Sequence, residues 1–126
     1  MAPRVLVVED NPVNLELAAE LLEQEGCQVL AAASAEAGLR LALAERPDLV
    51  LMDMQLPGLS GYEATRQLKA NPATAAIPVV ALTAFAMRGD DRKARDAGCD
   101  GYLTKPLDTD AFSETLRRFL TRAAGR

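Results

Sequence analysis

The chain has 126 residues, nearly half of them apolar and a quarter charged, which is typical of one globular domain. Its net charge of −4 gives no electrostatic reason for direct binding to nucleic acid or to an anionic membrane. The absence of histidine excludes histidine bases, Ser-His triads and His-ligated zinc within this sequence.

The two cysteines, Cys27 and Cys99, are far apart and form no CxxC motif, so we expect two reduced thiols. No signal-peptide pattern precedes the first predicted strand, and no apolar run reaches membrane-spanning length. These features predict a cytoplasmic protein without membrane insertion.

The first predicted strand covers Arg4–Val8. Asn11 and Pro12 then begin a helix, as its N-cap and first helical residue, and Gly26 ends it. Its inward face is predicted to carry Asn14, Leu17, Ala18, Leu21 and Leu22. The next elements are a strand over Gln28–Ala32, a helix that Ser34 caps and that ends before Pro47, and a strand over Asp48–Met52.

A loop rich in turn-forming residues follows, from Gln55 to Gly61. The remaining predicted elements are a helix over Tyr62–Ala70, a strand over Ile77–Leu82, a helix over Met87–Ala97, a strand over Cys99–Leu103 and a last helix from about Asp108. Strands that are apolar on both faces and alternate with helices predict a doubly wound α/β fold with right-handed crossovers. We expect a flavodoxin-like, five-stranded parallel sheet in the order 2-1-3-4-5 with five helices, forming one domain over residues 1–122, with residues 123–126 as a frayed tail.

Polar residues stand where the strands end, at the edge of the sheet where such folds bind ligands. Glu9 and Asp10 follow the first strand and Asp53 follows the third. If these two strands are neighbours, the three carboxylates meet and repel one another, and a divalent cation such as Mg²⁺ would relieve the repulsion. Taken alone, Glu9 and Asp10 are also compatible with an acidic turn that caps a helix.

Four motifs in order, VVEDNPVN, LMDMQLPGLSG, ALTAFAM and AGCDGYLTKP, cover nearly the whole chain. By these motifs the chain resembles a response-regulator receiver domain of two-component signalling. It is most similar to stand-alone receivers and to the receivers of hybrid histidine kinases. The resemblance implies a phosphorylation-dependent switch that passes its signal to a downstream protein target, and not an enzyme with turnover on other substrates.

The resemblance also implies a role for each matching residue. Asp53 would accept a phosphoryl group from a phosphohistidine of a partner, either a histidine kinase or a histidine phosphotransfer protein. Mg²⁺ would be bound by Asp10, by Asp53, by the backbone carbonyl of Gln55 and, through water, by Glu9. Lys105 would pair with a phosphoryl oxygen, and its bond to Pro106 is expected to be cis.

Further expectations concern switching and docking. Thr83 would donate its hydroxyl to the phosphoryl group, and Tyr102 would turn inward when Thr83 moves. Phe85 is expected to restrict the attacking water and so to prolong the phosphorylated state. Leu15, at the rim of its helix, and Pro106 are expected to dock a partner helix, while Val13 on the opposite rim fits docking and core packing equally well.

Two alternatives remain open at this stage. An Mg²⁺-dependent phosphohydrolase with an aspartyl-phosphate intermediate has a similar set of residues, but it typically carries a second Asp two positions after the nucleophile, where this chain has Gln55. A flavodoxin-like nucleotide binder would need an anion-binding loop after the first strand, where Glu9 and Asp10 would repel phosphate.

Overall fold

The computed structural model describes residues 2–84 and 90–124, over which strands and helices alternate. In chain order these are β1 (Arg4–Val8), α1 (Pro12–Gln24), β2 (Gln28–Ala32), α2 (Ala35–Glu45), β3 (Leu49–Asp53), α3 (Gly61–Ala70), β4 (Val79–Thr83), α4 (Asp90–Ala97), β5 (Gly101–Thr104) and α5 (Thr109–Ala124). Within the described residues no helix is both long and apolar enough to cross a bilayer.

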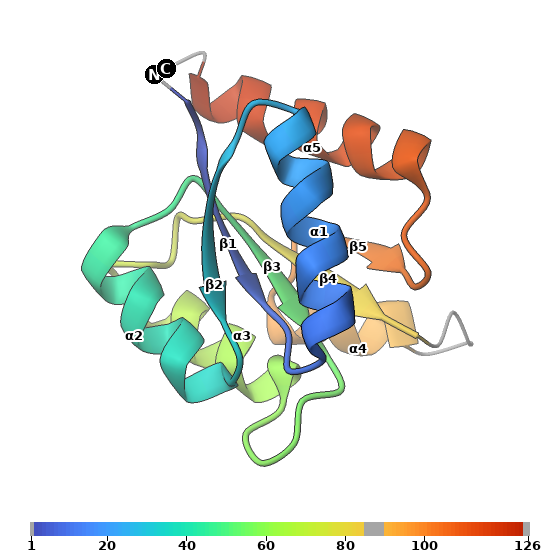
Figure 1. The fold of residues 1–126 in the computed structure, drawn as a ribbon. Coiled ribbons are helices and arrows are strands. Elements are labelled where there is room, and N and C mark those ends of the chain that lie inside the picture. Colours follow the sequence, from blue (N-terminus) through green and yellow to red (C-terminus); the bar gives the residue numbers. More distant parts are fainter. Residues whose placement is uncertain (1, 85–89, 125–126) are drawn as a thin grey trace.

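The strands form one parallel sheet in the order β2-β1-β3-β4-β5 (Figure 1). The predicted fold class and strand order are therefore confirmed. Because the order reverses between β1 and β3, the loops that follow these two strands diverge at the carboxyl edge of the sheet, where ligands bind in such folds.

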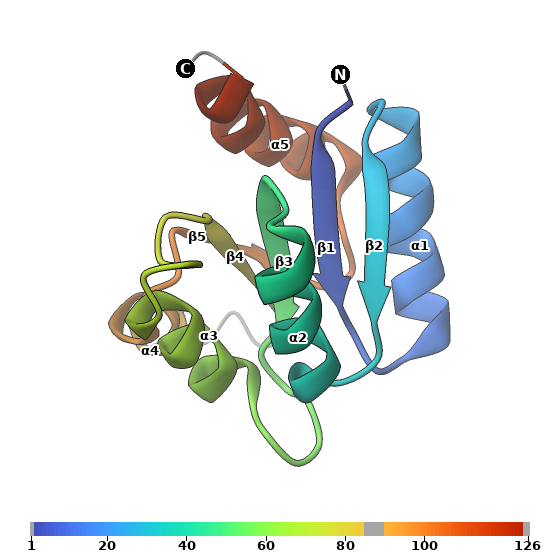
Figure 2. The same cartoon turned by 90° about the vertical axis from the view of Figure 1, so that its left-hand side faces the viewer.

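Helices cover both faces of the sheet, with α1 and α5 on one face and α2, α3 and α4 on the other (Figures 1 and 2). Alternate residues of β1 enter the two cores: Val5 and Val7 pack with α1 and α5, and Leu6 and Val8 pack on the opposite side. All four side chains are fully buried. Burial on both faces explains why the central strands read as unbroken apolar runs.

Three strands, β3, β4 and β5, begin one or two residues later than predicted, and an aspartate directly precedes the first and the last of them. The carboxylate of Asp48 accepts a hydrogen bond from the backbone N–H of Arg4 at 2.9 Å, and β3 begins at the next residue. In the same way, Asp100 accepts a hydrogen bond from the backbone N–H of Val79 at 2.8 Å, and β5 begins at Gly101. Both aspartates satisfy the donor of a neighbouring strand where the ladder starts.

The inward face of α1 also differs from the prediction. Ala18 and Leu22 are buried as expected, but Leu17 is 40% exposed, and Leu15 packs against the core between α1 and α5. Leu15 lies three residues before Ala18 and seven before Leu22, which is the spacing of one helix face.

The ends of the last two helices fall near the limits of the described chain. Helix α4 is described from Asp90, so the predicted start at Met87 lies outside the described residues. Helix α5 continues to Ala124, into the segment expected to fray, and residues 125–126 lie outside the description.

Candidate functional site

The carboxyl ends of β1 and β3 bring three acidic residues together. Val8 is paired with Met52 in the sheet, so Glu9 and Asp53 leave adjacent strands at the same level. Carboxylate oxygens of Glu9, Asp10 and Asp53 all lie within 4.8 Å of one another. The predicted meeting of these residues is therefore observed, and their hard oxygen donors suit Mg²⁺.

The three carboxylates differ in burial. The residues Glu9 and Asp53 are each only 2% exposed, whereas Asp10 is exposed to solvent. One oxygen of Glu9 contacts Lys105, and the other accepts a hydrogen bond from the backbone N–H of Asn11 at 3.2 Å. The backbone N–H of Glu9 is bonded to the carbonyl of Ala32 at 3.0 Å, which extends the pairing of β1 with β2. Both the side chain and the backbone of Glu9 are therefore fixed by contacts with neighbouring residues.

Lys105 supplies the positive charge of the site. Its Nζ lies 2.5 Å from a carboxylate oxygen of Glu9 and 3.2 Å from Oδ2 of Asp53. Its backbone N–H donates to the carbonyl of Thr83 at 2.8 Å, which fixes the loop after β5 against the end of β4. The peptide bond between Lys105 and Pro106 is cis, as expected.

The acidic and basic partners shift each other's protonation. Burial is the main cause that raises the pKa of Glu9 above its usual value, and its proximity to Asp53 adds to this, while Lys105 opposes it. Burial alone would lower the pKa of Lys105, but its hydrogen bond to Glu9 and the charge of Asp53 outweigh burial and raise it. Desolvation therefore contributes more to the raised pKa of Glu9 than repulsion by Asp53 does.

The loop after β3 is arranged around Asp53. The backbone N–H of Gln55 donates to Oδ1 of Asp53 at 3.0 Å, and the backbone N–H of Met54 bonds the carbonyl of Leu82 at 2.9 Å. A Cβ atom on Gly61 would lie 2.1 Å from the backbone oxygen of Asp53. Only glycine therefore fits where α3 begins, a constraint that was not deduced from the sequence.

The two residues expected to switch lie on adjacent strands. Thr83 ends β4 and is 2% exposed. It directly follows Leu82, which pairs with Asp53 in the sheet. Tyr102 pairs with Ala81 and is 41% exposed at the edge of the sheet. Phe85 lies outside the described residues.

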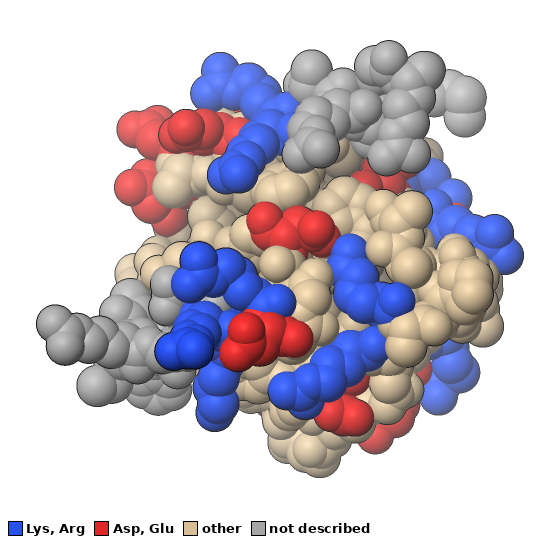
Figure 3. All heavy atoms as spheres, turned by 180° about the vertical axis from the view of Figure 1, so that it is seen from behind, with Lys and Arg blue, Asp and Glu red and all other residues tan. Residues whose placement is uncertain are grey.

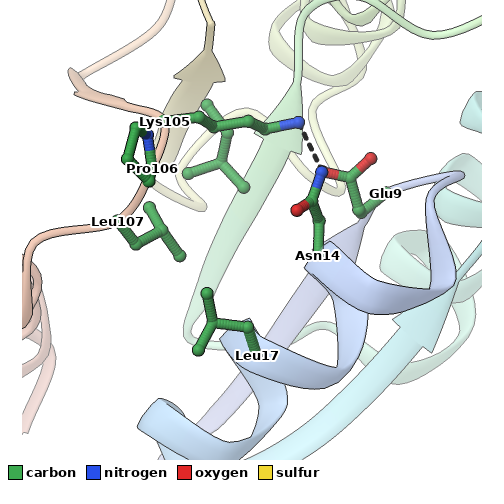
Figure 4. Close-up of a pocket in the computed structure, with 7 residues that line it drawn as sticks. Glu9, Asn14, Leu17, Lys105, Pro106 and Leu107 are labelled. Atoms are coloured by element: carbon green, nitrogen blue, oxygen red, sulfur yellow. Dashed lines mark hydrogen bonds and ion pairs between the residues drawn. The ribbon is translucent and has the colours of Figure 1, made fainter.

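The apolar residues that are exposed beside the site are not all the ones expected to dock a partner. Leu15 is half-buried against the core, whereas Val13 is 73% exposed and Leu17 is 40% exposed. A small cavity next to the site is lined by Glu9, Asn14, Leu17, Leu82, Lys105, Pro106 and Leu107 (Figure 4). Leu17 and Leu107 were not singled out from the sequence, although the spacing of Val13 and Leu17 by one helical turn is a signal for a shared face.

Comparison with known proteins agrees with this geometry. The family model of the response regulator receiver domain matches residues 5–117. The polar-differentiation response regulator DivK of Brucella anthropi is 42% identical over 120 residues, which cover 95% of this chain and 98% of that protein.

Two solved structures of receiver domains are also similar. The receiver domain of sensor histidine kinase PA1611 from Pseudomonas aeruginosa, which has a magnesium ion coordinated in its active-site cleft, is 36% identical with a TM-score of 0.89, covering 96% of this chain and 99% of that one. The receiver domain of Ssk1 from Saccharomyces cerevisiae, solved with the histidine phosphotransfer protein Ypd1, is 31% identical with a TM-score of 0.85, covering 94% and 88%.

Proposed function

Because the chain belongs to the response-regulator receiver family of two-component signalling, we propose that Asp53 accepts a phosphoryl group from a partner's phosphohistidine with the help of Mg²⁺. The observation that carries this proposal is the meeting of Glu9, Asp10 and Asp53 with Lys105 at one edge of the sheet. The magnesium ion reported for the PA1611 receiver supports the choice of metal. These 126 residues contain no histidine, so the donor imidazole lies outside them.

The transfer follows from the contacts of Asp53. A carboxylate oxygen of Asp53 forms a bond to phosphorus while the bond from phosphorus to the donor imidazole nitrogen breaks, and that nitrogen keeps the electron pair. Lys105, already 3.2 Å from Asp53, pairs with a phosphoryl oxygen as negative charge arrives. The N–H of Gln55 keeps the carboxylate oriented for attack.

Asp10 and Asp53, with the carbonyl of Gln55, are the residues that would hold Mg²⁺, and Glu9 would act through water. When bound, the metal supplies positive charge that neutralises phosphoryl oxygens. Glu9 has a second task in this proposal, because its contact with Lys105 holds the lysine at the site before phosphate arrives.

The phosphorylated state would act on a distant surface. Thr83 donates its hydroxyl to the phosphoryl group, and Tyr102, exposed at the edge strand β5, turns inward as Thr83 moves. A protein target would read the changed surface around β5. We place this switch in the cytoplasm, with a histidine kinase or a histidine phosphotransfer protein as donor, as the complex of the Ssk1 receiver with Ypd1 suggests.

A comparison of stoichiometric labelling with turnover tests the proposal. The protein is incubated with Mg²⁺ and acetyl phosphate and its intact mass is measured, and a second sample is assayed for hydrolysis of p-nitrophenyl phosphate. We expect one phosphoryl group per chain, none in Asp53→Asn, and no sustained ester hydrolysis. Multiple turnovers of the ester would favour the phosphohydrolase, and equal labelling of Asp53→Asn would remove Asp53 from its role.

A further inference from the structure

The sheet ends on one side at β2, whose outer edge has no partner strand among the described residues (Figures 1 and 2). The N–H of Gln28 and the carbonyl of Ala32 bond to the residues that flank β1, at 2.8 and 3.0 Å, so the even-numbered residues of β2 direct their backbone groups at β1. The N–H and C=O groups of Val29 and Ala31 therefore point outward. Such an edge can pair with an additional strand.

The residues of β2 do not protect this edge. Proteins usually guard an exposed edge strand with charged side chains, with proline or with a bulge. Gln28–Ala32 contains no charged residue and no proline, and its register with β1 is continuous over all five residues. Nothing in β2 itself therefore opposes the addition of a strand.

The opposite edge of the sheet, formed by β5, is bordered by charged side chains. The exposed lysines and arginines of the two helices beside it are Arg92, Lys93 and Arg95 of α4 and Arg117 and Arg118 of α5. Figure 3 shows basic side chains, with acidic ones among them, on this side of the molecule, which is turned away from the viewer in Figure 1. The two edges differ, because neither β2 nor α1 beside it contains a lysine or an arginine.

The flank of α1 beside the β2 edge is acidic. Glu25 accepts a hydrogen bond from α5, and Leu17, eight residues earlier, faces the loop after β5, so these two residues mark the flank of α1 that is turned toward α5 (Figure 4). The spacing of the helix places Glu16, Ala19 and Glu23 on the opposite flank, toward the outer edge of β2. Both of these glutamates are exposed.

The flank of α2 on the other face of β2 is apolar. Leu39 of α2 is turned toward α3, with which it lines a small cavity. Helix spacing therefore places Ala37, Leu41 and Ala44 on the opposite flank, beside the outer edge of β2. Arg40, the one basic residue of α2, lies two positions from each of two buried residues and so points away from the sheet.

We propose that the outer edge of β2 binds an extended segment of a protein partner in which apolar residues alternate with lysines or arginines. The segment continues the sheet through hydrogen bonds to Val29 and Ala31. Because the side chains of a strand alternate between two faces, its apolar residues lie against α2 and its basic residues lie beside the carboxylates of Glu16 and Glu23. The inference is independent of the proposed phosphoryl transfer.

Amide hydrogen exchange of the ¹⁵N-labelled wild type tests the pairing. The probe is a short peptide of alternating valine and lysine, and the control has the same composition with the valines and the lysines in separate blocks. Without peptide, the amides of Val29 and Ala31 should exchange fast and that of Leu30 slowly, because only Leu30 directs its N–H at β1. A saturating amount of the alternating peptide should slow exchange at Val29 and Ala31 about tenfold or more, and the control should not. Equal protection by both peptides, or by neither, would overturn the proposal.

N-methylated peptides separate backbone pairing from simple charge attraction. One version of the alternating peptide carries N-methyl groups on its lysines and the other carries them on its valines, so each version can donate hydrogen bonds from one edge alone. Backbone pairing requires that one version protects the Val29 and Ala31 amides and that the other does not. Protection by both versions would contradict the addition of a strand.

Matched charge variants test the role of the α1 flank. Glu16→Lys/Glu23→Lys should weaken binding of the alternating peptide about tenfold. Asp96→Lys/Glu114→Lys makes the same change in net charge at exposed positions on α4 and α5, and should alter the dissociation constant less than about twofold. Equal losses in the two variants would show that only net charge acts, which contradicts selection by this flank. The exchange experiments use the wild type, so they decide the matter even where a variant fails to fold.

A second copy of this chain fits the edge less well than a basic segment does. Symmetric pairing of two β2 edges is antiparallel and sets α1 of one copy beside α1 of the other, where Glu16 and Glu23 of the two copies repel. Sedimentation of the wild type at the NMR concentration should therefore show a monomer. A dimer that the alternating peptide dissociates would assign the edge to self-association and overturn the proposal.

Discussion

Replacement of Asp53 by asparagine should stabilise the metal-free protein. Asp53 is almost completely buried, and its carboxylate lies within 4.8 Å of oxygens of Glu9 and Asp10. One favourable charge opposes this repulsion, the Lys105 ammonium at 3.2 Å. The hydrogen bond from the Gln55 N–H to Oδ1 can persist, because asparagine keeps an oxygen at that position.

The magnitude follows from these distances. At an effective dielectric constant near 20, each repulsion at 4.8 Å costs about 3.5 kcal/mol, so the two together cost about 7 kcal/mol. The attraction to Lys105 at 3.2 Å returns about 5 kcal/mol, which leaves a difference of about 2 kcal/mol in favour of the amide. Solvent screening of the exposed Asp10 reduces this difference, and the desolvation cost of a buried carboxylate, which the amide avoids, adds to it.

Thermal unfolding followed by circular dichroism in EDTA at pH 8 measures the effect. A gain of about 2 kcal/mol raises the melting temperature by roughly 5–10 °C in a domain of this size. Asp100→Asn is a matched control. Asp100 lies outside the acidic cluster and forms an ion pair with Lys69, with 2.9 Å between the two charged groups, so its replacement should lower the melting temperature. If Asp53→Asn melts below the wild type, repulsion does not dominate the site and the reasoning is refuted.

Further predictions follow from individual groups. Magnesium should raise the melting temperature of the wild type by mass action and leave Asp53→Asn nearly unchanged; calorimetry that finds equal stabilisation would contradict the metal site. The pKa of Glu9 is raised in the folded state, so its ionisation destabilises the metal-free protein at neutral pH, and as pH falls through that pKa the wild type should gain stability relative to Glu9→Gln; parallel pH curves of the melting temperatures would exclude this. Thr83→Ala should weaken the NMR shifts that a beryllofluoride phosphoryl mimic causes around Tyr102 while the mimic still binds, and unchanged shifts would remove Thr83 from the switch. Burial raises the pKa of Cys99 to about 11, so in Cys27→Ser iodoacetamide at pH 8 should label Cys99 far more slowly in the folded than in the unfolded protein, and equal rates would refute its burial.

The fold could be predicted from the sequence because its signals are local and repeated. Strand-length apolar runs ended by Glu9, Asp53 and Thr83 identify buried parallel strands, and the topology of such sheets brings their ends to one edge. The meeting of Glu9, Asp10 and Asp53 followed from this rule together with the strand order.

Features that depend on side-chain packing could not be predicted from the sequence. A pair of adjacent acidic residues does not show which one is buried. In the structure Glu9 is buried and contacts Lys105, which comes from the loop after β5, whereas Asp10 is exposed. The inward face of α1 was predicted incorrectly for a similar reason, because the sequence does not show which of two nearby leucines is buried. Leu15 and Leu17 both lie close to Ala18 in sequence, and only the packed structure shows that Leu15 contacts the core whereas Leu17 is 40% exposed.

The location of the phosphoryl group tests the account most directly. The wild type is phosphorylated with acetyl phosphate and Mg²⁺, reduced with borohydride, which converts an aspartyl phosphate to homoserine, and digested for peptide mass spectrometry. The account predicts homoserine at position 53 and at no other aspartate. Homoserine at position 10, or a phosphoryl group that survives on a hydroxyl side chain, would contradict the assignment of Asp53 as the acceptor.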